Sequence, residues 1–412
     1  MKRKIVYRKK CSFYFLLISI FLFTIGLFAF IASNEFQVNT YAGWIKDRPA
    51  IAMDEEENFV ITWVTWEFYG GYEVFARRFN SKGKAIATEF KVNTYINFWQ
   101  DSPAIAMHKK GNFVITWQSY PQDGSGYGVF VKRFNSKGKA RGREFQVNTY
   151  NEGDQGYPAI AMDEKGNFVI TWESWQQDGS HWGVYAQRFN SKGKARGREF
   201  QVNTYNEGDQ QYPAIAMDEK GNFVITWESW LQDGSDWGVY AQRYNSKGEA
   251  MGTEFQVNTY MKWYQWHPAI AMDRKGNFVI TWGSEGEDGS SYGVYAQRFK
   301  KNGEAVGSEF QVNTYTQKSQ DYPAVAMDNG GNFVISWESQ RQDGSGTGIF
   351  AQMYNRKGVA VGNEFQVNTY IRNMQALPAI AMKKKNKYIV TWISDHQDGS
   401  GVFARMFLKW AK

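Results

Sequence analysis

One segment is repeated along almost the whole chain. The motif EF(Q/K)VNTY begins at Glu35, Glu89, Glu144, Glu199, Glu254, Glu309 and Glu364, so successive copies are almost equally spaced. The motif PA(I/V)AM and a strand-like segment ending in tryptophan each occur seven times as well. A fixed period of this size is typical of solenoids, propellers and arrays. The chain is therefore expected to consist of seven similar structural units.

Each repeat predicts four short strands. In the repeat that begins at Glu144, EFQVNTY alternates between apolar and polar residues, PAIAMD is made of small residues, and NFVITW and VYAQRF are apolar on both faces. The turns DEKGN and NSKGK contain Gly166 and Gly193, which can adopt the positive φ that tight hairpins require. Seven groups of four antiparallel strands predict an all-β fold, a seven-bladed β-propeller of four-stranded blades over residues 35–412.

The two ends of the repeated region predict how the ring closes. The first repeat begins with the outer strand, residues 35–41, whereas no EFQVNTY follows the last apolar segment, residues 402–407. We therefore expect the N-terminal strand to complete the last blade, which would leave no open sheet edge.

Residues 1–33 form a separate N-terminal segment. Six cationic residues come first and an apolar run over residues 13–32 follows. Such a run is long enough to cross a bilayer core of about 30 Å as one hydrophobic helix. The pattern favours an uncleaved signal anchor, with single-pass attachment to the cell membrane and the propeller outside the cytoplasm. A cleaved signal peptide, which would release the propeller by secretion or into the periplasm, is the alternative.

The charge balance disfavours a nucleic-acid partner. The formal net charge is +7, but the first ten residues hold six cations and the remainder has 42 basic against 41 acidic residues. A nearly neutral folded part lacks the field that attracts polyanions in general. The single cysteine, Cys11, cannot form a disulfide within the chain.

The repeat motifs resemble a known family. GNFVITW, QDGSGYGVF, RFNSKG and EFQVNTY are similar to a tandem repeat of large exported bacterial adhesin-like proteins. The resemblance covers about nine-tenths of the chain. It implies an extracellular, non-catalytic repeat module, and it supplies no catalytic residue to carry over.

Tryptophan-rich loops on one face are the predicted binding surface. Indole rings beside acidic and amide side chains commonly stack on sugars or anchor a partner. Their alternative role is to cap the blade edges. The seven tryptophans that end the NFVITW-like segments are instead expected to lie in the core. The predicted ligand-binding residues are Trp99, Trp175, Trp182, Trp230, Trp237, Trp263, Trp266, Asp178 and Asp233. The expected function is carbohydrate binding by a monomer, and a protein-interaction or adhesion scaffold is the alternative.

Catalytic and metal chemistry is not favoured by the sequence. Each QDGS segment offers one aspartate, which is typical of a turn former rather than of a calcium site, so no cofactor is expected. Glu173, Glu228 and Glu338 follow the strand tryptophan and are candidate general acids of a glycan hydrolase. We interpret them instead as solvated strand ends, because similar blades place such groups far apart. The sequence therefore predicts that the chain is not an enzyme.

Overall fold

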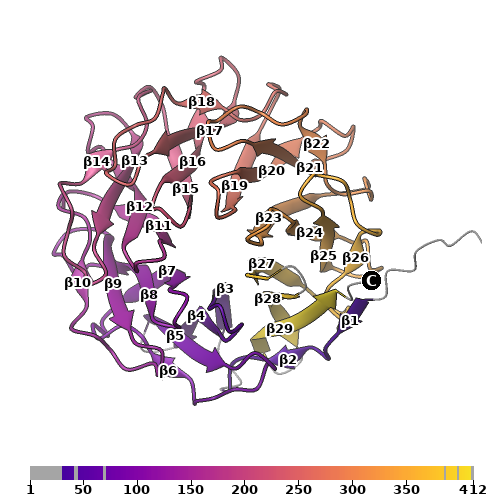
Figure 1. Ribbon diagram of the computed structural model, residues 1–412, viewed down its shortest axis with the longest axis horizontal. Coiled ribbons are helices and arrows are strands. Elements are labelled where there is room, and N and C mark those ends of the chain that lie inside the picture. The colour runs from indigo at the N-terminus through magenta and orange to yellow at the C-terminus, as the bar shows by residue number, and fades with distance from the viewer. Residues whose placement is uncertain (1–29, 41–44, 68–70, 385–386, 397–398, 410–412) are drawn as a thin grey trace, which may run out of the picture.

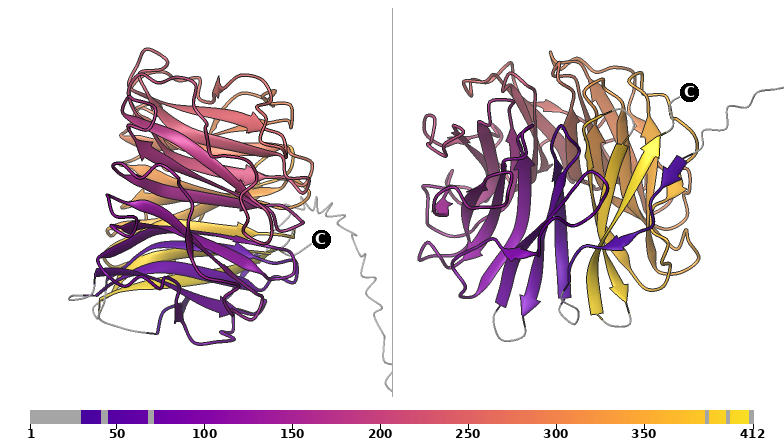
Figure 2. Two further views of the ribbon diagram at one scale, coloured as in Figure 1. Left: turned by 90° about the vertical axis from the view of Figure 1, so that its left-hand side faces the viewer. Right: turned by 60° about the horizontal axis from the view of Figure 1, so that its bottom comes forward.

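The computed structural model describes residues 30–40, 45–67, 71–384, 387–396 and 399–409. Figure 1 shows their strands arranged in sheets around a common centre, with one edge of each sheet facing inward. Figure 2 shows the ring from other directions, with strands that run between two opposite faces. No helix occurs in the described part of the chain, so the all-β prediction is confirmed.

Each repeat contributes strands of four kinds, which follow one another from the centre outward. The inner strands are β3 (Ile45–Met53), β7 (Trp99–Met107), β11 (Gln155–Met162), β15 (Gln210–Met217), β19 (Gln265–Met272), β23 (Gln320–Met327) and β27 (Gln375–Met382). The second strands are β4 (Phe59–Glu67), β8 (Phe113–Tyr120), β12 (Phe168–Trp175), β16 (Phe223–Trp230), β20 (Phe278–Glu285), β24 (Phe333–Gln340) and β28 (Lys387–His396). The third strands are β5 (Gly71–Phe79), β9 (Gly128–Phe134), β13 (Trp182–Phe189), β17 (Trp237–Tyr244), β21 (Tyr292–Phe299), β25 (Thr347–Tyr354) and β29 (Gly399–Lys409). The outer strands are β2 (Phe36–Gln37), β6 (Phe90–Lys91), β10 (Phe145–Gln146), β14 (Phe200–Gln201), β18 (Phe255–Gln256), β22 (Phe310–Gln311) and β26 (Phe365–Gln366).

The connections alternate between the two faces of the ring because neighbouring strands within a repeat are antiparallel. We call one side the link face: it carries the segments from an outer strand to the next inner strand, such as residues 147–154, and the hairpins between second and third strands, such as 176–181. The other side is the turn face. It carries the hairpins between inner and second strands, such as 163–167, and the connections from third to outer strands, such as 190–199.

The described strands pair into six sheets, one fewer than the number of sequence repeats. Four sheets have four strands each, and β3–β10 form one sheet of eight. In that sheet the first two repeats are joined by a parallel bridge between Tyr72 and Trp99. The last sheet contains β27, β28, β29, β1 and β2. Repeated four-stranded antiparallel sheets agree with the predicted propeller-like architecture.

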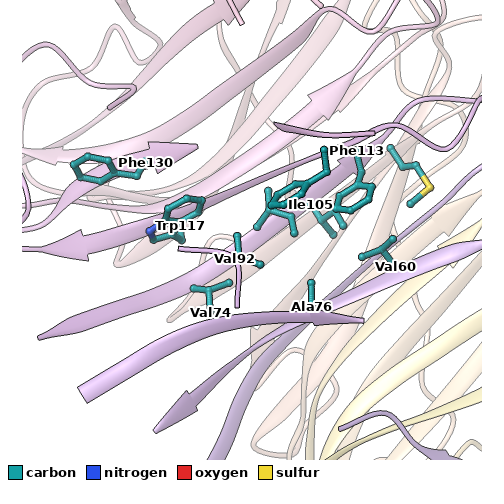
Figure 3. Packing of buried hydrophobic residues seen from close by; sticks show 11 residues of the cluster. Val60, Val74, Ala76, Val92, Ile105, Phe113, Trp117 and Phe130 are labelled. Carbon is teal, nitrogen blue, oxygen red and sulfur yellow. The ribbon is translucent and has the colours of Figure 1, made fainter. Parts of the chain in front are cut away.

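Buried apolar side chains fill the spaces between neighbouring sheets. Figure 3 shows one cluster, in which Val60 and Val74 of the first repeat pack with Ile105, Phe113 and Trp117 of the second. A fully buried large apolar side chain contributes roughly 1.5–3 kcal/mol to stability. The second strands each place one tryptophan in these clusters, 0–1% exposed, as the sequence predicts: Trp63, Trp117, Trp172, Trp227, Trp282, Trp337 and Trp392.

The outer strands are shorter than the repeated motif predicts. After two paired residues, an asparagine side chain replaces the backbone as the acceptor: Asn148 Oδ1 accepts the N–H of Val129 at 2.8 Å. Because the acceptor now lies on a side chain, backbone pairing ends there. The same bond is made by Asn39, Asn93, Asn203, Asn258, Asn313 and Asn368.

The ring is closed by the N-terminal strand, as predicted. Phe36 and Gln37 of β2 pair antiparallel with Ala404 and Phe403 of β29, and Figure 1 shows the two strands side by side. A second bond repeats around the whole circle: a glutamate carboxylate accepts the N–H of a threonine in the preceding repeat. The pairs are Thr40–Glu89, Thr94–Glu144, Thr149–Glu199, Thr204–Glu254, Thr259–Glu309, Thr314–Glu364 and, across the closure, Thr369–Glu35, at 2.6–2.8 Å.

The N-terminal helix prediction is not supported where the structure describes that segment. Residues 1–29, with the cationic residues and most of the apolar run, lie outside the described residues. The end of the run, β1 (Phe30–Ala32), is a strand paired with residues 407–409 of β29. A purely apolar run has no period that separates a buried strand from a helix. Strand β1 contradicts the predicted anchor helix and, with it, the single-pass membrane localisation. Within the described residues no helix is long and apolar enough to cross a membrane.

Ring closure can be tested through the threonine–glutamate bond. We expect Glu35→Ala to lower the free energy of unfolding by about 1–2 kcal/mol, because the N–H of Thr369 loses a charged acceptor. Urea unfolding followed by tryptophan fluorescence measures this loss.

Glu89→Ala is the matched control, since it removes the same bond, to Thr40, inside the ring. The two variants should lose similar stability. A silent Glu35→Ala beside a destabilised Glu89→Ala would mean that the circle is open.

Candidate functional site

Every inner strand is interrupted at the same place, just before a proline. The register with the second strand shifts there in each repeat, for example between Gly156 and Ala159. The residue before the proline adopts a left-handed backbone, with φ between 47° and 53°. These residues are Arg48, Ser102, Tyr157, Tyr212, His267, Tyr322 and Leu377. A left-handed conformation is uncommon for a residue other than glycine, so the surrounding structure must hold it.

A side-chain oxygen accepts the N–H of each left-handed residue. In four repeats the oxygen comes from the preceding repeat, from the residue after the core tryptophan. The bonds are Gln118–Tyr157, Glu173–Tyr212, Glu228–His267 and Glu338–Leu377. In the other three repeats the oxygen comes from the aspartate just before the left-handed residue: Asp47–Arg48, Asp101–Ser102 and Asp321–Tyr322.

The two sources of the oxygen replace each other in space. At three repeat boundaries the residue after the core tryptophan of the preceding repeat has no polar side chain: Val64, Gly283 or Ile393. At these boundaries the aspartate is present instead. A Cβ added at Gly283 would lie 2.4 Å from Asp321 Oδ1, and one added at Gly156 would lie 2.8 Å from Gln118 Oε1. Each repeat boundary therefore has room for one of the two acceptors.

The seven left-handed residues and their prolines line a pocket on the ring axis, at the link face. Its volume is about 330 Å³. One side is aromatic: the Tyr157 and Tyr212 rings meet edge to face at 4.7 Å, and His267 stacks on Tyr322 at 4.0 Å. The other side holds Arg48, whose guanidinium lies 5.1 Å from the centre of the Tyr157 ring. The pocket thus combines aromatic surfaces with one cation.

Two carboxylates flank Arg48, which lines this pocket, but they do not line the pocket themselves. Its Nε lies 3.9 Å from Asp47 Oδ2 and 3.5 Å from Asp101 Oδ1, and its Nη1 donates to Ser102 Oγ at 2.6 Å. Burial raises the pKa of Asp47, although the bond from Arg48 N–H and the Arg48 charge oppose this. The guanidinium therefore sits between two acids that belong to neighbouring repeats.

A second ionic pair lies across the pocket. His267 Nδ1 is 3.4 Å from Asp321 Oδ1. Burial alone would lower the pKa of His267, but the hydrogen bond and charge of Asp321 outweigh it and the pKa is raised. This pair favours a protonated imidazole that faces the pocket.

Of the three glutamates interpreted as solvated strand ends, two are buried and Glu338 is half-buried. Glu173 and Glu228 are 2% and 3% exposed. Burial raises the pKa of Glu173 to about 8 and that of Glu228 to about 7. Burial also raises the pKa of Glu338 to about 7. The solvated interpretation is wrong because each carboxyl reaches into the next repeat, 39 residues ahead, to accept a backbone N–H.

The predicted tryptophans all lie on the link face, spread over several repeats. Trp175 packs edge to face with Trp182 at 5.4 Å, and Trp230 packs with Trp237 in the same way. The first ring of each pair also covers a link glycine, Gly153 in the case of Trp175. These contacts favour the capping role.

The remaining predicted tryptophans differ in exposure. Trp99 is 44% exposed and stacks on Tyr120 at 5.6 Å, and Trp263 is 52% exposed. Trp266 is half-buried and lies 5.2 Å from the His267 ring. Trp266 is thus the predicted tryptophan in contact with a residue of the axial pocket, while Trp99 and Trp263 remain accessible.

The predicted aspartates form turns. Asp178 Oδ1 accepts the N–H of Ser180 at 3.0 Å, and Asp178 Oδ2 accepts Gln201 Nε2 at 2.9 Å. Asp233 makes the equivalent two bonds. The described residues contain no group of three or more His, Cys, Asp or Glu side chains that could hold a metal ion.

The axial pocket is not predicted from the sequence. Its seven lining side chains are inner-strand residues that vary between repeats, each directly before a fixed proline. A variable residue beside a fixed proline is the signal that could have located the pocket. The left-handed backbone that directs these residues depends on contacts between repeats, which the sequence pattern does not display.

Comparisons with known proteins identify the fold. A protein of unknown function from Dyadobacter fermentans matches with a TM-score of 0.56 and 8% identity, over 92% of this chain and 99% of that one. An alpha-L-arabinofuranosidase from Fusarium graminearum, in complex with an iminosugar inhibitor, matches with a TM-score of 0.52 and 12% identity, over 74% and 92%. The NanB sialidase from Streptococcus pneumoniae matches with a TM-score of 0.50 and 9% identity, over 91% and 70%. No family model and no curated protein matches the chain.

These neighbours correct one prediction. The sequence predicts a non-catalytic module, but neighbours that share the fold are glycan-hydrolysing enzymes. At identities this low the likeness shows the fold alone, so the activities named are those of the neighbours. The resemblance to an exported adhesin-like repeat family is not tested by these comparisons and stays a prediction.

The buried acids predict a defined pH dependence of stability. The pKa of Glu173 is raised from 4.5 to about 8 in the folded chain, so its protonated form stabilises the fold. That contribution is complete below pH 4.5 and is lost as the pH rises through 8. Glu173→Gln keeps the acceptor and removes the titration. At pH 9 we expect the variant to have a free energy of unfolding roughly 1–3 kcal/mol higher than that of the parent, and therefore to unfold at a higher temperature. At pH 5 the two proteins should differ little.

Gln118→Glu is the reciprocal variant, because Gln118 makes the same bond to Tyr157. It should lose stability at pH 9 and not at pH 5. If thermal unfolding shows the same difference between Glu173→Gln and the parent at both pH values, the carboxyl is not held neutral by burial.

Proposed function

We propose that the chain is a glycan hydrolase whose active site lies in the axial pocket. The observation that carries this proposal is the pair Asp47 and Asp101 on either side of Arg48. Glycosidases use two carboxyl groups about 5–10 Å apart, in unlike environments. Each carboxylate here lies within 4 Å of the same Arg48 nitrogen, so their oxygens are separated by less than about 8 Å, which does not exceed that range.

The surroundings support different roles for the two acids. Asp47 has a raised pKa and a side chain that is 38% exposed, which suits a general acid that donates a proton to the leaving oxygen. Asp101 is fixed by Arg48 and by the N–H of Ser102, which suits a base or nucleophile held in one position. Arg48 keeps both carboxyl groups in place.

The rest of the pocket is suited to a sugar. Tyr157, Tyr212 and Tyr322 present aromatic surfaces, on which the apolar face of a sugar ring can pack. Arg48, Ser102 and His267 supply polar groups to orient hydroxyl or acidic substituents. A cavity of about 330 Å³ is at the small end of ligand sites, which favours a terminal sugar over an internal segment of a polysaccharide.

We also propose that the ring has seven blades. The eight-stranded sheet counts as two blades joined by the bridge from Tyr72 to Trp99, and seven equivalent threonine–glutamate bonds support this count. Secretion, rather than membrane attachment, is the location we propose for this activity.

Removing one charge at a time tests the catalytic pair. We expect Asp47→Asn and Asp101→Asn each to lower kcat/KM by at least a hundredfold, because general acid–base catalysis contributes about 10²–10⁴. Release of sugars from a panel of chromogenic glycosides and plant and bacterial polysaccharides is the measurement. Asparagine can still accept the backbone N–H, so both variants should fold.

Asp321→Asn is the matched control, because it caps Tyr322 in the same manner but does not contact Arg48. Its kcat/KM should stay within about tenfold of the parent. Equal losses in all three variants would point to a shared structural role, and no turnover of any glycan by the parent chain would refute a hydrolase.

A further inference from the structure

Grooves between neighbouring repeats lie on the turn face, away from the axial pocket. Three equivalent grooves have volumes of about 570, 730 and 350 Å³ and lie between repeats 1 and 2, 4 and 5, and 5 and 6. Each contains an arginine of a third strand and an apolar residue of the following connection, Arg243 and Met251 in the largest. Along β19, Pro268 borders the pocket and Met272 borders the groove, roughly 13 Å further on. The grooves are therefore separate from the proposed active site.

The three grooves differ in charge. The groove between repeats 4 and 5, which we call the 4–5 groove, has six basic and two acidic residues in its lining: Lys220, Arg243, Arg274, Lys275, Lys300 and Lys301 against Asp218 and Glu219. The equivalent groove between repeats 1 and 2 has three basic and three acidic residues. The groove between repeats 5 and 6 has three basic residues and one acidic residue. The largest groove is thus also the most cationic.

Two cations of the 4–5 groove are paired with acids: Lys300 with Glu304 at 2.8 Å and Arg274 with Glu55 at 2.6 Å. Both oxygens of Asp218 are used by its own turn, by the N–H groups of Lys220 and Asn222 and by Asn222 Nδ2. Arg243 donates to the carbonyls of Lys301 and Met251, and burial, with no acid to oppose it, lowers its pKa. Among the described residues no ion pair involves Lys220, Lys275 or Lys301. Three lysines are left to bind an external anion.

Repeat 5 departs from the other repeats to create this charge. At the turn after the third strand, repeats 1 to 4 have Asn-Ser, and the asparagine side chain accepts two backbone N–H groups, as Asn245 does from Lys247 and Glu249. Repeat 5 has Lys300 and Lys301 there. A lysine cannot accept a hydrogen bond, so the cap is reduced to one bond, from the N–H of Glu304 to Asn302 Oδ1 at 3.2 Å. A local rule broken in one repeat is expected at a functional site.

We propose that the 4–5 groove binds a segment of an acidic polysaccharide, a chain of sugars that carry carboxylate groups. The lysines match the carboxylates, and Met251, Met272 and Tyr244 provide an apolar floor for the sugar rings. A nucleic acid is less suited, because the chain beyond its first ten residues is close to neutral and the positive charge is most concentrated in one groove. The site is independent of the proposed hydrolase activity.

The double variant Lys300→Asn, Lys301→Ser tests the site and restores the Asn-Ser of four other repeats, so it should fold at least as stably as the parent. Isothermal titration calorimetry with tetragalacturonate at 50 mM salt is the measurement. We expect saturable binding by the parent chain, weakened at least tenfold in the variant. The fully methyl-esterified tetramer, which has the same rings without the charges, should bind at least tenfold more weakly than the acid.

A control removes the same charge elsewhere on the turn face. Lys192→Asn, Lys194→Ser alters the equivalent turn of repeat 3, outside the 4–5 groove, and should leave the affinity unchanged. If both double variants weakened the affinity for tetragalacturonate equally, only the net charge of the chain would matter, and the proposal would be overturned. Unchanged affinity in Lys300→Asn, Lys301→Ser, or equally tight binding of a single-stranded oligonucleotide, would also overturn it. Because binding is measured without hydrolysis, the result does not depend on the axial pocket.

Discussion

The hydrogen bond to the left-handed residue before each proline determines the chemistry of the ring centre. Proline restricts the residue before it, and a left-handed backbone costs of order 1–3 kcal/mol. The N–H of that residue no longer belongs to the strand ladder, and an unpaired N–H buried there would add a further cost. A side-chain oxygen meets this need in all seven repeats. Once the backbone is held in this way, the side chain itself is directed to the axis and is free to differ, from Arg48 to Tyr157 to Leu377.

The source of that oxygen sets the electrostatics of the pocket. Where a glutamate from the preceding repeat supplies it, the acid is enclosed and tends to stay neutral, as Glu173 does. Where an aspartate of the inner strand supplies it, the acid stays closer to the pocket and pairs with a cation, as Asp101 does with Arg48 and Asp321 with His267. One structural requirement, met in two ways, therefore produces both neutral buried acids and ionic pairs around one cavity.

Features that recur in every repeat can be predicted from the sequence, and features that depend on contacts between repeats cannot. The constant period and the apolar strands predict four-stranded sheets and the buried Trp172, because these follow from local patterns. The short outer strands are not predictable, since Asn148 ends them through a side-chain bond. The environment of Glu173 is missed because its partner, Tyr212, is 39 residues away. Trp175 is expected to be exposed because its contact with Gly153 forms only when the link folds over the hairpin.

Internal repetition offers its own comparison, because each repeat shows which residues the framework needs. Gln118 and Glu173 occupy equivalent positions and accept the same kind of backbone bond from the next repeat. A difference of this kind, which keeps every framework bond, gives little information about function. A difference that gives up a bond is more informative. Lys300 replaces an asparagine that caps the turn with two bonds in five other repeats, and it places a cation, paired with Glu304, beside Lys301. Random change in the sequence would be expected to retain the cap, or to weaken it without concentrating positive charge at this turn. The substitution in repeat 5 therefore favours a binding role for the 4–5 groove.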